Sequence, residues 1–155
     1  MSQEPTTSHN EPPRDPSSLP PEALDLAAKL FDLARDGQTN DLSTYLTQGI
    51  PPNLTDSRGN TLLMLAAYHD HADTVTMLLG KGADPNAAND RGQSPLAGAV
   101  FKGFEDVVKV LVQGGADVWG GQPNAVECAK MFKREALLEI MGVGTNGVNG
   151  VEESK

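Results

Sequence analysis

The strongest constraint on the fold of this chain is a sequence repeat with a period of 33 residues. When the sequence is shifted by 33, ten residues between positions 56 and 88 fall on identical residues between 89 and 121. The longest matches are Arg58-Gly59 with Arg91-Gly92 and Gly82-Ala83-Asp84 with Gly115-Ala116-Asp117. Random pairing at typical residue frequencies gives about two identities. Such a period is typical of repeat proteins, in which each unit buries its apolar face against its neighbours.

Two further units flank this central pair and are more divergent. A shift back by 33 places Leu63 on Leu30 and Gly82 on Gly49. A shift forward aligns residues 124–129 with 61–66 if the last loop is about three residues shorter. We therefore predict four repeats, at about 23–55, 56–88, 89–121 and 122–142. The first and last should act as caps, because terminal repeats present a polar outer face.

Each unit has the pattern of two helices and a turn. Thr61 and Ser94 are suited to cap the first helix, with Pro95 in its first turn, where a missing N–H costs nothing. The second helix carries apolar residues at helical spacing, such as Val75, Leu78 and Leu79. Gly82 and Gly115 are expected to end it in the left-handed conformation. The Asp or Asn, Arg and Gly residues that follow are typical of turns.

The residues that recur in each unit resemble the ankyrin repeat. The resemblance is carried by Thr61–Ala67, His71, Leu78-Leu79, Gly82–Asp84 and the turn Asp56–Gly59. It covers about residues 22–142 and implies an all-α ankyrin-repeat solenoid of helix-turn-helix units joined by hairpin-like loops. Three residues depart from the family pattern, namely Leu62, Asp70 and Phe104. We expect these departures to affect local turns and not the architecture.

Composition sets the limits of the folded region. Residues 1–20 and 143–155 contain too few apolar residues to offset chain entropy, so we predict that both tails are disordered and that 21–142 forms the domain. No apolar run reaches about 18 residues, and the N-terminus lacks the pattern of a signal peptide. A net charge of −9 with no Lys or Arg run opposes binding to nucleic acid or to an anionic membrane. We expect a monomer in the cytoplasm, with the nucleus as a second compartment.

Several motifs resemble reactive or ligand-binding sites. His69-Asp70-His71 suggests metal ligands, but His71 matches the family's histidine that hydrogen-bonds backbone near the turn between helices. Gly142–Gly147 matches G-x-G-x-x-G, but it follows a helix and not a strand. Cys128 has no histidine within its own repeat and is expected to be a buried apolar residue. We therefore predict no enzymatic activity, no metal and no cofactor.

The resemblance implies that a protein partner binds the concave face, through the loop tips and the exposed ends of the first helices. The predicted partner-binding residues are Ser57, Arg58, Asn60, Tyr68, His69, Asp90, Arg91, Gln93, Phe101 and Lys102. Tyr68 and Phe101 are 33 apart and should align on neighbouring repeats. Aromatic and Arg side chains are enriched at binding hot spots, although packing over the alanine-rich helices is the alternative.

Three other aromatic or apolar residues belong to the last loop and the last repeat. Met131 and Phe132 occupy the matching positions of repeat four, where Phe132 could instead close the cap. Trp119 is expected to cover the start of the shortened last loop.

Two functions remain open at this point. The first is a non-catalytic adaptor, scaffold or inhibitor that acts through the concave face. The second is a regulatory protein recognised through its Pro-rich N-terminal tail, where Pro13-Arg-Asp-Pro16 has PxxP spacing and the repeats serve as a stable carrier.

Overall fold

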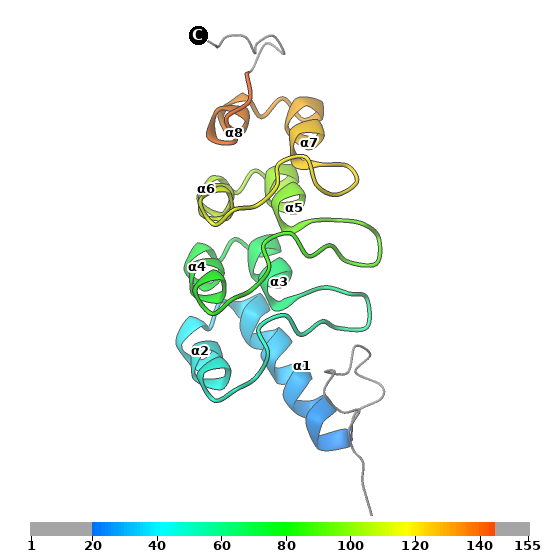
Figure 1. Cartoon of the computed structure of the whole chain (residues 1–155), viewed down its shortest axis with the longest axis vertical. Coiled ribbons are helices and arrows are strands. Elements are labelled where there is room, and N and C mark those ends of the chain that lie inside the picture. The colour runs from blue at the N-terminus through cyan, green and yellow to red at the C-terminus, as the bar shows by residue number, and fades with distance from the viewer. Residues whose placement is uncertain (1–19, 145–155) are drawn as a thin grey trace, which may run out of the picture.

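The computed structural model describes residues 20–144, which form eight helices in two columns (Figure 1). The first column contains α1 (Pro21–Asp36), α3 (Leu62–Tyr68), α5 (Pro95–Lys102) and α7 (Ala125–Met131). The second contains α2 (Thr39–Thr47), α4 (Ala72–Gly80), α6 (Glu105–Gln113) and α8 (Glu135–Ile140). Long loops before α3, α5 and α7 extend to the side of the first column. The all-α stack of helix pairs that the sequence predicted is thus confirmed.

Small side chains allow the helices of the first column to approach each other closely. Ala66, Ala99 and Ala129 occupy corresponding places on α3, α5 and α7, and all three are fully buried. Larger side chains, among them Leu63 and Leu78, fill the space between the columns and are also fully buried. The core therefore runs continuously through the stack, as expected where each repeat buries its apolar face against the next.

Side-chain caps fix where the first helices begin. The Thr61 Oγ1 accepts the Met64 N–H at 3.0 Å, and the Ser94 Oγ accepts the Ala97 N–H at 3.0 Å. Both caps were predicted. In repeat four, Asn124 and Glu127 form a reciprocal capping box, in which each side chain accepts a backbone N–H of the other residue.

The loops before α3 and α5 are shaped by one side chain each. The Asp56 carboxylate accepts the N–H groups of Arg58 and Asn60, both at 2.9 Å. Asn89 accepts the corresponding groups of Arg91 and Gln93 at 2.9 and 3.0 Å. These bonds hold the backbone of the two loop tips in the same conformation, and they confirm the predicted turns.

Neighbouring repeats are also connected through asparagine side chains. The Asn53 Oδ1 accepts the Asp84 N–H at 2.8 Å, and the Asn86 Oδ1 accepts the Asp117 N–H at 2.7 Å. Trp119 occupies the next position in this series, and its side chain is 60% exposed. The covering role expected for Trp119 stays a prediction.

The turns between the two helices of a repeat use the left-handed conformation. Gly37 and Gly103 have φ of 74° and 78° there, and Asp70 and Lys133 adopt φ of 65° and 57° at the equivalent positions. Asp70 therefore keeps the turn geometry despite its departure from the family pattern. It does so with backbone strain, because the Cβ atom of an L-residue is crowded in this conformation.

Substitution Asp70→Gly should therefore stabilise the protein by about 0.5–1 kcal/mol, because relief of strain exceeds the added flexibility of the unfolded chain. Thermal unfolding followed by circular dichroism would measure the change. Asp73→Gly is the matched control, since Asp73 is exposed within α4, where glycine should lower stability by about 0.5–1 kcal/mol. A lower melting temperature for Asp70→Gly would contradict this explanation.

The folded part extends slightly past its predicted end. The Val143 N–H donates to the Leu138 carbonyl at 2.8 Å, and its side chain packs against the core, so Val143 does not belong to a tail. Of the two predicted tails, residues 1–19 and 145–155 lie outside the described range. None of the helices within residues 20–144 combines the length and the apolarity needed to cross a membrane.

Candidate functional site

Two adjoining hollows lie along the first column of helices and the loops before α3 and α5. The apolar pocket, about 420 Å³ in volume, is lined mainly by Tyr68, Gly98, Phe101, Cys128, Met131 and Phe132. The polar hollow, about 520 Å³, is lined by the loop residues Ser57, Arg58, Asn60, Asn89, Asp90 and Arg91. Tyr68 and Gln93 line both. We refer to the two hollows together as the groove.

The predicted partner-binding residues collect in this groove with one exception. The loop-tip residues line the polar hollow, whereas Phe101 and Lys102 line the apolar pocket. His69 lines neither; it is exposed and follows the last residue of α3. Partial burial lowers the pKa of its imidazole, and the positive charge of Lys102 lowers it further. His69 therefore lies beside the groove, near Lys102.

A missing side chain creates the space that Tyr68 fills. The Tyr68 ring lies over Gly98 so closely that a Cβ atom at position 98 would overlap it. Position 98 corresponds to Leu65 of the preceding repeat, so an apolar side chain is absent from α5 at this point. Burial raises the pKa of the Tyr68 hydroxyl, and the neighbouring Cys128 raises it further. Tyr68 is therefore partly packed and partly a wall of the groove.

Phe101 contacts a ring that the 33-residue spacing did not predict. Its ring meets that of Phe132 edge to face, with 5.0 Å between centroids and 81° between planes. Both rings remain well exposed, at 51% and 43%, and the neighbouring Met131 is 64% exposed. Tyr68 and Phe101 thus line one pocket from two repeats, as expected, while Phe132 forms the aromatic pair. Exposed apolar side chains gathered around a pocket are typical of interaction sites.

Cys128 lies at the buried side of the apolar pocket. Its side chain is 4% exposed, which confirms the expectation of a buried cysteine on the first helix of repeat four. Burial raises the pKa of the thiol, and the charge of Glu127 raises it further. Because the thiolate is the reactive form, these surroundings make Cys128 a weak nucleophile.

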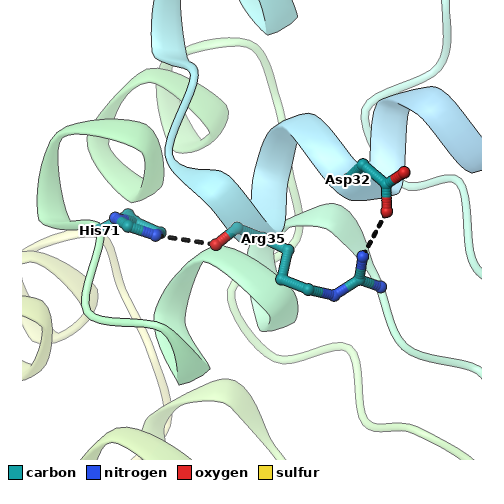
Figure 2. A network of polar contacts seen from close by, with 3 residues as sticks. All are labelled: Asp32, Arg35 and His71. Atoms are coloured by element: carbon teal, nitrogen blue, oxygen red, sulfur yellow. Dashed lines mark hydrogen bonds and ion pairs between the residues drawn. The ribbon is translucent and has the colours of Figure 1, made fainter.

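His71 has a structural role, as its resemblance to the family's histidine predicted. Its Nε2 lies 2.8 Å from the Arg35 carbonyl oxygen at the end of α1, and the Arg35 side chain pairs with Asp32 (Figure 2). Within residues 20–144, no three His, Cys, Asp or Glu side chains are grouped to hold a metal ion. Gly142 follows α8 at a φ of 80°, and the last three residues of its G-x-G-x-x-G motif, 145–147, lie beyond the described range.

Arg134 performs a similar role in the last repeat, which sequence reasoning missed. Its guanidinium donates to the Phe101 carbonyl at 2.8 Å and lies against Gly103. Arg134 precedes α8 just as His71 precedes α4, and this shared position is the signal that could have identified it. The bond holds the end of α5, and therefore the backbone of Phe101, in place beside the groove.

Comparison with known proteins agrees with the repeat pattern. A family model described as ankyrin repeats, in three copies, matches residues 30–120. A curated ankyrin repeat protein of Pseudomonas aeruginosa is 52% identical over 56 residues, which are 36% of this chain and 33% of that protein. The chain therefore matches about a third of the length of this relative.

Proposed function

Because this chain belongs to the ankyrin repeat family, we propose that it is a non-catalytic adaptor, scaffold or inhibitor that binds a protein partner through the groove. Ankyrin repeats are in general protein-interaction modules, and the family is typically non-catalytic. The observation that carries the proposal is the gathering of Tyr68, Phe101, Met131 and Phe132 around one pocket on the face that carries the loop tips. In a chain with only 5% aromatic residues, such clustering favours a binding surface.

Rigid surroundings add support for this proposal. The loop tips are held by Asp56 and Asn89, and the end of α5 is held by Arg134. A surface that is already ordered loses little conformational entropy when a partner binds, so more of the contact energy appears as affinity.

The substitutions Tyr68→Ala and Phe101→Ala together should weaken partner binding at least tenfold. Truncation of hot-spot residues costs about 2 kcal/mol each, and every 1.4 kcal/mol corresponds to about a factor of ten in affinity. Affinity capture from a native cell extract with the full chain, quantified for each protein recovered, would measure the loss. Circular dichroism should show that the double variant keeps its helical content.

Two matched variants make this experiment decisive. Trp119→Ala removes an exposed aromatic ring outside the groove and should leave the captured partner unchanged. Pro13→Ala with Pro16→Ala tests recognition through the N-terminal PxxP sequence. If the partner is lost only from the proline variant, the tail is the recognised element and the groove proposal fails. Equal recovery with a folded Tyr68→Ala/Phe101→Ala variant would also contradict it.

A further inference from the structure

We propose that the groove recognises an acidic protein segment that carries one large apolar side chain. This inference rests on the proposed function and specifies the chemistry of the partner. The apolar side chain enters the apolar pocket, and carboxylates on either side of it pair with Arg58, Arg91 and Lys102.

The apolar pocket has the character of an anchor site for a single side chain. The pocket lies beside the Tyr68 ring, which packs over Gly98, and it reaches the buried Cys128. Phe101 and Phe132 form a wall whose two rings support each other edge to face. Among residues 20–144, no carboxylate lines this pocket, and Lys102 is the one charged residue that does. Buried apolar pockets that accept one large side chain are where binding energy concentrates.

The charge of the groove is opposite to that of the chain. The folded part holds 10 Lys and Arg against 16 Asp and Glu. The groove lining, by contrast, carries three cations, Arg58, Arg91 and Lys102, and one carboxylate, Asp90. Within residues 20–144, none of these three cations forms an ion pair. The Lys102 Nζ lies over the Phe104 ring, 5.9 Å from its centroid, and keeps its charge there. All three cations can pair with a partner's carboxylates, and such complementarity sets specificity and speeds association.

The Asp90 carboxylate offsets only one of these three positive charges. The Asp90 Oδ1 lies against the preceding loop, 2.6 Å from where a Cβ atom would stand on Gly59, and its backbone N–H donates to the Arg58 carbonyl. Asp90 is therefore held against the backbone of the neighbouring loop. Because Asp56 and Asn89 hold the backbone at Arg58 and Arg91, these two cations project from fixed positions.

A protein segment fits these features better than a nucleic acid does. A long polyanion would extend past the groove and meet the net negative charge of the rest of the chain, which weakens binding to phosphate backbones. A short acidic segment meets only the groove. A segment with an apolar side chain between carboxylates also uses both hollows, because the side chain enters the apolar pocket and a carboxylate reaches the polar hollow. Tyr68 and Gln93 line both hollows and so connect them.

A library of random 16-residue peptides displayed on phage and selected on the full chain tests the proposal. Enriched peptides should carry Phe, Trp, Tyr, Leu or Met with Asp or Glu within about three residues of it. A representative peptide is then synthesised, and its dissociation constant is measured by fluorescence polarisation. Its affinity should fall steeply with added salt, because exposed charge pairs are screened.

Matched variants separate the charge from the pocket. Arg91→Glu with Lys102→Glu should weaken binding of the peptide at least about tenfold. Lys81→Glu with Lys109→Glu makes the same change in net charge at exposed residues outside the groove. This variant should bind the peptide with an affinity within about twofold of that of the unsubstituted chain. Phe101→Ala with Phe132→Ala should also weaken binding at least about tenfold. Thermal melts show which variants are folded. If the Arg91→Glu/Lys102→Glu variant is not folded, the single substitution Lys102→Glu replaces it in the binding measurement.

Results that differ from these expectations overturn distinct parts of the proposal. The enriched peptides could lack acidic residues, bind the Arg91→Glu/Lys102→Glu variant as well as the original protein, and fail to bind the Phe101→Ala/Phe132→Ala variant. That result would reject the acidic chemistry and leave the groove's function intact. Peptides that bind every folded variant equally would reject the groove as well. Failure to enrich any peptide overturns this inference, whereas the capture experiment judges the proposed function separately.

Two additional probes identify competing occupants. A 12-nucleotide oligothymidylate that binds the chain and is lost on charge reversal would assign the groove to nucleic acid, which overturns the proposal. A synthetic peptide of residues 145–155, which holds two valines beside Glu152 and Glu153, is the second probe. If this peptide competes with the selected peptide at equal or higher affinity, the groove belongs to the chain's own C-terminal segment and not to a partner.

Discussion

Substitution Leu78→Ala is expected to lower the free energy of unfolding by about 3–4 kcal/mol, one of the two largest effects that the fold predicts. Leu78 is fully buried on α4, which packs against both α2 and α6. Its truncation removes apolar contacts with two neighbouring repeats at once and leaves a cavity that the rigid stack cannot close. Chemical denaturation followed by circular dichroism would give the change.

The adjacent residue on the same helix provides the control for this loss. Leu79 is only partly buried, and it packs beside Gly114, the residue that follows α6. Leu79→Ala removes the same atoms but should cost only about 1–2 kcal/mol, because less apolar surface leaves contact with the core. Equal losses for the two variants, or a loss below about 1 kcal/mol for Leu78→Ala, would show that the second column is not packed as described.

Substitution Gly37→Ala should also destabilise the protein strongly, by about 2–3 kcal/mol. Gly37 ends α1 with a φ of 74°, where an L-residue costs about 1–2 kcal/mol. A Cβ atom at this position would lie 2.5 Å from the His71 Nδ1, so the ring must move. That movement breaks the hydrogen bond between His71 and the Arg35 carbonyl, which adds about 1 kcal/mol. Chemical denaturation of the full chain measures the sum.

Gly92 separates backbone strain from the loss of the His71 contact. It has a similar φ of 76°, and a new Cβ atom there would lie 3.9 Å from the Gln122 Cβ, an ordinary contact distance. Gly92→Ala should therefore cost only about 1–2 kcal/mol of strain. In a variant that already carries His71→Ala, the loss of unfolding free energy caused by Gly37→Ala should fall to the same value. If Gly37→Ala stays equally costly without the His71 ring, the ring is not what Gly37 accommodates.

The parts of this fold that could be predicted from sequence are those decided within one repeat. The caps at Thr61 and Ser94 and the turns at Asp56 and Asn89 depend on residues two to four positions away. The 33-residue period then extends each local assignment to its neighbour. For the same reason, the loop-tip members of the candidate site were found together in the polar hollow.

The features that sequence did not predict arise from packing between repeats. The last loop is three residues shorter, as the alignment of the repeats predicted, and α7 begins 30 residues after α5, whereas α5 begins 33 residues after α3. Which side chains then meet could not be predicted from the period. The contact between Phe101 and Phe132 is one such feature, and the exposure of Trp119 is another. Gly98 offered one unused signal, since glycine inside a helix is unfavourable and often marks the close approach of another group.

Amide hydrogen exchange of the full chain, free and with its captured partner bound, tests the central claim most directly. Binding through the groove predicts slower exchange in the loop tips at 56–60 and 89–93 and in the exposed ends of α5 and α7. The helices of the second column, α2, α4, α6 and α8, should exchange as in the free protein. Protection confined to that column, or to residues 1–20, would contradict a binding site in the groove.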